Sequence, residues 1–284
     1  MRKSTEPKVE PKKCIFCGLQ KKMSGEHIWG KWLKQYLRLD QKRHNIEIHR
    51  VLAPNEPSAA HIEIRTGDPL RSKVRVVCVD CNSQWLGKIQ EHAKSLLIPL
   101  ILGKTTSLSP SAQKQVAIWC AMATMTGEYL DRDPEAKAIT EDERKWFSEN
   151  SVVPPNWRIW IARYQRFKWK GQWMHVTAPI LFGQEISKLS PGEYSRANTQ
   201  TTTFVIGELY VHTMSSTNAD LISSWVWPPF SRISRSMIQI WPPKESFIAW
   251  PTDSFRDEDA DLIPNIFNRM VDQASRSITG RRIF

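Results

Sequence analysis

The feature that most constrains this chain is a set of four cysteines in two pairs, Cys14-x-x-Cys17 and Cys78-x-x-Cys81. Two Cys-x-x-Cys pairs together supply the four thiolates of a closed tetrahedral zinc site. Such a site would bring segments about sixty residues apart onto one small platform. The alternative is four unpaired thiols in a core, and the sequence favours zinc.

The remaining cysteine usage and the hydropathy pattern predict the compartment. Five cysteines among 284 residues are too few for a disulfide framework, which indicates a reducing environment. Cys120 lies in an apolar helical run and is predicted to be a buried thiol. The charged N-terminus does not resemble a signal peptide, and no window reaches the roughly 20 apolar residues of a membrane span. We therefore expect a cytoplasmic protein without a membrane segment.

The net charge of +11 is concentrated near the cysteine pairs. Residues 1–94 contain 19 Lys and Arg against 10 Asp and Glu, whereas residues 95–284 contain 21 against 19. A cationic surface attracts a phosphate backbone. The charge therefore favours a nucleic acid as partner, although a solvated basic face is the alternative.

Three polar residues lie beside the cysteine pairs and have the chemistry of a hydrolytic site. Glu26 and His27 follow the first pair, and Asn82 directly follows the second. Histidine titrates near neutral pH and can activate water as a general base. Carboxylate and amide oxygens suit Mg²⁺ or Mn²⁺. Phosphodiester hydrolysis needs an activated water together with charge relief on the phosphate.

These motifs together resemble the HNH endonucleases of the four-cysteine, ββα-metal type. The resemblance covers residues 14–93 and rests on the two cysteine pairs, Ser24-Gly25-Glu26-His27-Ile28, Trp32-Leu33 and Cys81-Asn82-x-x-Trp85. It implies that His27 activates water and that Glu26 and Asn82 hold the catalytic Mg²⁺ or Mn²⁺. It also implies a structural Zn²⁺ on Cys14, Cys17, Cys78 and Cys81.

The chain departs from the family pattern in two places. The family more often has aspartate before the histidine, and Glu26 is one methylene longer. Many members carry an asparagine shortly before the second cysteine pair that orients the histidine, whereas Arg71-Ser72-Lys73 occupies that stretch here. The group that orients His27 is therefore left open, with a backbone carbonyl as one candidate.

Several exposed-looking cations near these motifs are candidates for binding the nucleic acid. They are Lys21, Lys22, Lys31, Lys34, Lys73 and Arg75. DNA is the expected partner, and RNA stays open. One active site per chain predicts nicking of one strand, and double-strand cleavage would require a homo-oligomer.

We predict an α+β fold with four parts. Residues 1–13 form a basic disordered leader, 14–94 the zinc-bound ββα module, 95–152 a helical connector, and 153–284 an antiparallel-sheet domain rich in tryptophan. This last domain holds eight of the thirteen tryptophans. It is either a recognition or regulatory domain, which would contact bases or a protein partner, or a sheet whose core is built from tryptophan.

Periodicity and capping signals predict the individual elements. The predicted helices span residues 29–39, 82–93, 109–130, 140–150 and 257–275. The predicted strands span 45–51, 61–65, 73–77, 157–164, 173–176 and 203–211. Trp-Pro units at 227–229, 241–243 and 250–251 are expected at sheet edges or in loops, because proline cannot donate to a central ladder.

The sequence leaves three hypotheses for function. The first is a metal-dependent HNH endonuclease, in a setting such as bacterial or phage DNA defence or a mobile element. The second is a zinc-stabilised nucleic-acid-binding module without cleavage activity. The third is an interaction protein whose zinc module only stabilises the fold. The presence of Glu26, His27 and Asn82 together favours the enzyme, because binding alone needs none of them.

Overall fold

The computed structural model describes residues 13–37, 45–51, 60–66, 69–134, 136–166, 168–180, 197–225 and 232–265. Predictions that fall elsewhere lie outside the described residues. They include the leader up to residue 12, the Trp-Pro unit at 227–229 and the end of the 257–275 helix.

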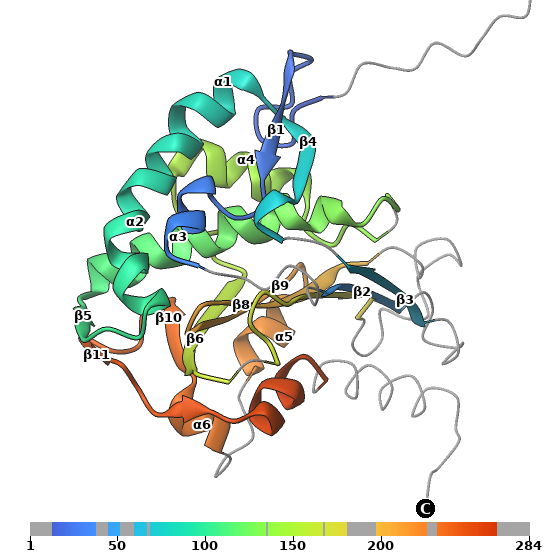
Figure 1. The fold of residues 1–284 in the computed structure, drawn as a ribbon. Coiled ribbons are helices and arrows are strands. Elements are labelled where there is room, and N and C mark those ends of the chain that lie inside the picture. The colour runs from blue at the N-terminus through green and yellow to red at the C-terminus, as the bar shows by residue number, and fades with distance from the viewer. Residues whose placement is uncertain are drawn as a thin grey trace, which may run out of the picture.

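A large mixed sheet crosses the molecule (Figure 1), with strand order β10-β6-β9-β8-β7-β2-β3 and with β12 also paired to β6. The strands are β2 (Asn45–Val51), β3 (Ala60–Thr66), β6 (Trp157–Tyr164), β7 (Trp173–Ala178), β8 (Thr199–Ile206), β9 (Leu209–Ser216), β10 (Ile238–Trp241) and β12 (Ser254–Phe255). Neighbours run antiparallel except for the parallel pairs β2–β7 and β12–β6. The fold is α+β, and its tryptophan-rich sheet agrees with the prediction.

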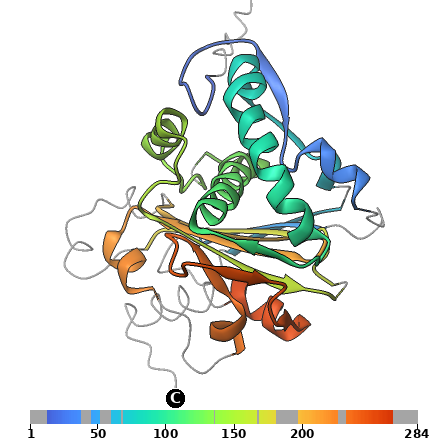
Figure 2. The same ribbon diagram turned by 90° about the vertical axis from the view of Figure 1, so that its left-hand side faces the viewer.

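Helices cover both faces of this sheet (Figures 1 and 2). One face carries α2 (Gly87–Ile101), α3 (Pro110–Gly127) and α4 (Glu141–Asn150). The other carries the shorter α5 (Ala219–Ser224) and α6 (Arg232–Ser236), together with helical residues 257–265. The remaining elements are β1 (Met23–His27), η1 (Lys31–Gln35), η2 (Pro69–Arg71), β4 (Lys73–Cys78), α1 (Val79–Cys81), η3 (Asn82–Leu86), β5 (Thr106–Leu108), η4 (Glu128–Leu130) and β11 (Ile248–Trp250).

Alternation along the strands divides the core into two layers. Successive strand side chains point to opposite faces. In β6, Trp157 and Ile159 therefore pack with the long helices, whereas Trp160 and Tyr164 pack with the short ones. The layer under the long helices also includes Cys14. Residues of the predicted zinc module, connector and C-terminal domain thus share one core.

The tryptophans are mostly core residues, as one of the two sequence interpretations expects. Trp157, Trp173 and Trp250 are among the largest fully buried side chains. Trp241 ends β10 at the sheet edge and Trp250 ends β11, so the two described Trp-Pro units lie at strand ends as predicted. Cys120 is buried in α3, also as predicted.

Two helix starts follow their sequence signals. The Ser109 side chain accepts a hydrogen bond from the Ala112 N–H, with Pro110 in the first turn of α3. Thr140 and Glu143 form a reciprocal capping box at the start of α4. Both predicted helices are therefore confirmed.

Two element predictions are wrong. The helix expected over 29–39 is reduced to the short 3₁₀ helix η1, preceded by Gly30, which has extended backbone and no capping side chain. The single strand expected over 203–211 is a hairpin, β8–β9. Gly207 has a φ of +60° in its turn, a conformation that glycine adopts without strain. A glycine inside an apolar run is a turn signal, and the prediction of one strand followed the periodicity and disregarded it.

A buried ion pair joins η4 and α4 on the long-helix side of the sheet. Arg144 of α4 binds Glu128 of η4, and both side chains are almost fully buried. Glu128 Oε1 also accepts hydrogen bonds from the N–H groups of Ala138 at 2.9 Å and Ile139 at 3.1 Å. Burial raises the pKa of Glu128, and the charge of Arg144 opposes that rise.

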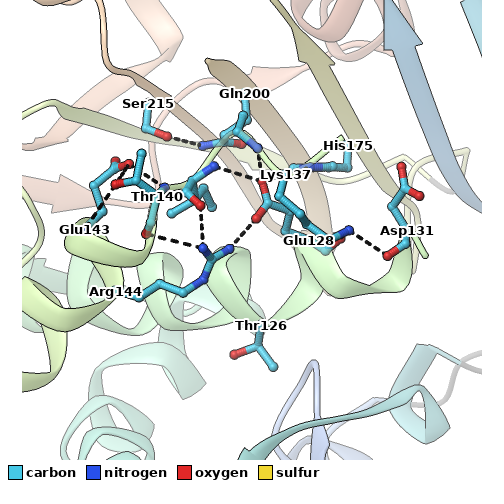
Figure 3. Close-up of polar contacts among 12 residues, drawn as sticks. Thr126, Glu128, Asp131, Lys137, Thr140, Glu143, Arg144, His175, Gln200 and Ser215 are labelled. Atoms are coloured by element: carbon cyan, nitrogen blue, oxygen red, sulfur yellow. Dashed lines mark hydrogen bonds and ion pairs between the residues drawn. The ribbon is translucent and has the colours of Figure 1, made fainter. Parts of the chain in front are cut away.

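This ion pair faces a chain of polar groups on the sheet (Figure 3). His175 Nδ1 lies 2.8 Å from Thr202 Oγ1, which donates to Gln200 Oε1 at 2.7 Å. Gln200 Nε2 in turn donates to Ser215 Oγ at 3.2 Å. Buried polar groups are costly unless paired, so these hydrogen bonds favour one arrangement of the polar side chains on β7, β8 and β9.

We expect Arg144→Met to lower the free energy of unfolding by about 3–5 kcal/mol, because it leaves Glu128 buried without its counter-charge. Lys145→Met on the same helix is the control, since its partner Glu149 lies 3.9 Å away in a solvent-exposed pair worth about 0–1 kcal/mol. Urea unfolding measures both. Equal midpoints for the two variants would contradict a stabilising role of the buried pair.

A second prediction concerns His212, whose ring nitrogen Nδ1 lies 2.7 Å from Thr203 Oγ1. Burial lowers the pKa of His212 to about 3, whereas an unfolded histidine titrates near about 6.5. The unfolded state therefore takes up the proton first, and stability present above pH ~6.5 is lost as the pH falls, by about 1.4 kcal/mol per unit. His212→Gln should reduce this slope between about pH 6 and pH 4, as followed by urea unfolding. His92→Gln, at an exposed position, should keep the wild-type slope.

Candidate functional site

The four predicted cysteine ligands lie together. Their Sγ atoms are all within 4.8 Å of one another, and none is in a disulfide. Cys17 Sγ and Cys78 Sγ are 3.8 Å apart, which matches the edge of about 3.8 Å in a tetrahedron with Zn–S bonds of about 2.3 Å. A disulfide would bring two sulfurs to about 2.05 Å. The cluster can therefore hold a metal such as zinc.

Local backbone geometry shapes both cysteine pairs. In the first pair, the Gly18 N–H donates to the Cys14 carbonyl at 2.9 Å, and Gly18 has a φ of +68°. In the second, Cys78 is the N-cap of α1, and its sulfur accepts from the Cys81 N–H at 3.5 Å. The Cys78 N–H points to Cys14 Sγ at 3.4 Å. Burial opposes ionisation of Cys14, but N–H donors outweigh it and lower its pKa.

An aromatic cluster holds the thiol platform against the helical layer. Phe16 lies between the first two cysteines, and its ring centroid is 5.1 Å from that of Trp85 in an edge-to-face contact. Phe147 of α4 lies 5.6 Å from Trp85 and 6.1 Å from Phe16. Such pairs add to the stabilisation that burial provides. The platform is thus packed into the core.

The polar residues of the motif lie on elements next to the cysteine cluster. Glu26 and His27 are on β1, and Asn82 is on the helix that begins at the second cysteine pair. β1 pairs antiparallel with β4, with an irregularity between Ser24 and Glu26, and β4 leads directly into α1, η3 and α2. Asn82 was expected to cap a helix, but that helix begins at Val79, so Asn82 lies inside it. Its side chain is therefore available to interact with β1.

The structure brings Glu26 and Asn82 together. Asn82 Nδ2 donates to Ser24 Oγ at 2.8 Å, and Ser24 Oγ donates to the Val77 carbonyl at 3.1 Å. Glu26 is buried, and the Asn82 side chain lies close enough to act on its carboxyl. Burial raises the pKa of Glu26 to about 7 against the lowering effect of Asn82. Within the described part of the chain, Glu26 forms no ion pair.

His27 occupies the end of β1, opposite Lys73 in the β1–β4 register, and is half-buried. Burial, followed by the charges of Lys73, Lys31 and Lys34, lowers its pKa to about 4. Among the described residues, no side chain makes a hydrogen bond to its imidazole. The imidazole is thus neutral at neutral pH and lies in a positive field.

All six predicted cationic contacts are exposed: Lys21, Lys22, Lys31, Lys34, Lys73 and Arg75. Lys21 pairs with Asp80 at 2.7 Å. Three of the six, Lys73, Lys31 and Lys34, lie close enough to His27 to lower its pKa. An open hollow of about 680 Å³ lies on η3 and α2 just beyond Asn82 and includes Lys88 and His92.

Two residues that position this site were missed as functional by the sequence reasoning. Ser24 binds Asn82, and Gln90 Oε1 accepts from Trp32 Nε1 at 3.2 Å and from Trp119 Nε1 at 2.9 Å. Gln90 thereby connects η1, α2 and α3. No spacing signal identifies Gln90, because its partners lie on separate elements; Ser24 stood within the motif without a role.

No protein family, curated protein or solved structure matches this chain. None of the helices in the described ranges combines the length and the hydropathy required to span a bilayer.

We expect Cys17→Ser to lose the bound zinc and to lower the melting temperature, because three thiolates leave the tetrahedral site incomplete. Metal content measured by atomic spectroscopy on the purified proteins, together with thermal unfolding, tests this. Cys120→Ala is the matched control, since its thiol is buried in α3 away from the cluster. Equal zinc content in wild type and Cys17→Ser would show that the four thiols do not bind the metal.

Proposed function

We propose that this protein is a metal-dependent nuclease of the HNH type, which hydrolyses DNA phosphodiester bonds. The observation that supports it best is the placement of Asn82, on the following helix, near Glu26 on β1, which is held by the 2.8 Å hydrogen bond from Asn82 Nδ2 to Ser24 Oγ. The two residues come from either side of a hairpin whose ends are joined by the four-thiol cluster. A structural zinc module by itself requires neither residue there.

Each residue has a role that its surroundings support. His27 accepts the proton of the attacking water, since its imidazole is neutral and only half-buried. Ser24 orients the Asn82 side chain by accepting a hydrogen bond from its Nδ2, and Asn82 also acts on the Glu26 carboxyl. Because its Nδ2 donates to Ser24, Asn82 keeps its carbonyl oxygen as an acceptor.

Glu26 and Asn82 are also the residues that would hold the catalytic ion. The buried Glu26 carboxyl, which has no cationic partner in the described residues, and the Asn82 carbonyl oxygen are the kinds of donor that suit Mg²⁺ or Mn²⁺. A bound divalent ion would neutralise charge on the scissile phosphate and on the leaving oxygen. The chain itself supplies the proton acceptor and the cationic surface.

The lysines near His27 favour a polyanionic substrate. Lys31 and Lys34 on η1 and Lys73 on β4 are exposed, and all three act on His27 electrostatically. A phosphate backbone brought to His27 would therefore meet several cations at once. As part of the same proposal, we assign Lys21, Lys22 and Arg75 to the contact with the phosphate backbone.

We expect the wild-type protein to nick supercoiled DNA in the presence of Mg²⁺ or Mn²⁺ and His27→Ala to cut at least about a hundredfold more slowly, the scale of a lost general base. Gel assays under single-turnover conditions measure the rates. His92→Ala provides a control, because that histidine is exposed on α2 and has no assigned role in the reaction.

Zinc content and thermal stability must match among the three proteins for the comparison to be valid. Cleavage that persists in His27→Ala would refute the role of this histidine. If none of the three proteins cuts although all bind DNA, the alternative of a zinc-stabilised binding module replaces the nuclease.

A further inference from the structure

A second hollow lies at the β10 edge of the large sheet, away from the cysteine cluster. It has a volume of about 520 Å³ and is lined by residues of β6, α6, β10, β11 and the loop between the last two. In Figure 1, β10, β11 and α6 lie at the lower left, whereas β1 and β4 lie at the top. The helices α2 and α3 and the sheet separate the two places.

The floor of this hollow is apolar and already ordered. Trp160, Met237 and Ile248 line it and are 3%, 6% and 2% exposed. Trp160 lies in the middle of β6, between partners on β9 and β10, and its ring contacts that of His212 at 5.7 Å between centroids. The floor of the hollow is therefore preformed and apolar, and the aromatic surface that a ligand can reach belongs to the rim.

The rim combines an exposed aromatic ring with cations from two elements. Phe247 is 59% exposed, and Trp225 contributes a second, partly buried ring. Arg235 comes from α6 and Lys244 from the loop after β10, and both are exposed. Neither forms an ion pair within the described part of the chain. Glu245 is the one carboxylate in the lining, which therefore keeps a net positive charge.

We propose that this hollow binds a phosphorylated nucleoside, with the base against the aromatic side chains and the phosphate at Arg235 and Lys244. Every base has a π-face that stacks on aromatic rings, and arginine and lysine are the usual phosphate partners. The volume falls within the range of about 300–1,000 Å³ of small-molecule sites. A free mononucleotide and an unpaired nucleotide of a polynucleotide share this chemistry.

The test measures binding without any cleavage. Adenosine monophosphate and adenosine are titrated by calorimetry, and a fluorescein-labelled single-stranded oligonucleotide by anisotropy, in buffer without Mg²⁺ or Mn²⁺. The variants are Phe247→Ala and the double variant Arg235→Ala/Lys244→Ala, all at exposed positions. The controls are Trp146→Ala, an exposed aromatic on α4, and Lys145→Ala/Arg166→Ala, which removes the same charge from other exposed positions.

We expect Phe247→Ala to bind adenosine monophosphate about tenfold more weakly, the scale of one lost base stack. The double variant should lose the preference for adenosine monophosphate over adenosine and should show a weaker salt dependence. Binding of both probes identifies the nucleotide itself as sufficient. Binding of the oligonucleotide alone, with the same losses in the variants, identifies a polynucleotide as the source.

Absence of binding by both probes, or wild-type affinity in both pocket variants, overturns the proposal. His27→Ala should bind both probes as the wild type does, because His27 lies on the other side of the sheet. Failure of the nuclease proposal would thus appear as absent cleavage with intact nucleotide binding, and the two failures are distinguishable.

Discussion

The rest of the structure depends on closure of one long loop between the two cysteine pairs. Cys17 Sγ and Cys78 Sγ lie 3.8 Å apart although 61 positions separate them. Part of the intervening segment returns as β2 and β3, which extend the large sheet through the parallel pairing of β2 with β7. The same segment is therefore held by the thiol cluster at its ends and by the sheet between them. Metal binding would stabilise both arrangements at once.

This closure brings the residues of the candidate site together. β1 and β4 pair beside the cysteine cluster, with Met23 opposite Cys78, and that pairing sets Ser24 in hydrogen-bond contact with Asn82 and Glu26 near it. The aromatic contacts of Phe16 with Trp85 and Phe147 then join the platform to α4. The site thus rests on packed elements instead of on mobile loops, which favours a fixed geometry of its polar groups.

The two faces of the large sheet serve different ends. The face under the long helices contains the buried Glu128–Arg144 ion pair and, on the sheet itself, a hydrogen-bonded chain of His175, Thr202 and Gln200. Each of these hydrogen bonds restricts the orientations of the two side chains that form it. The opposite face carries the aromatic cluster around Trp160 and Tyr210, whose edge opens as the nucleotide-sized hollow. One face thus contains the buried polar groups, and the edge of the other contains the proposed ligand site.

The sequence by itself determined the features that depend on neighbours along the chain. The cysteine spacing, the caps at Ser109 and Thr140, and the alternation in 157–164 each predicted an observed element, because turns, caps and strand periodicity are local. Only the tertiary structure decided how distant segments meet. The place of Asn82 inside a helix, the β2–β7 pairing and the buried partner of Glu128 all depend on contacts between remote residues. Periodicity records which side of an element is buried but not what covers it.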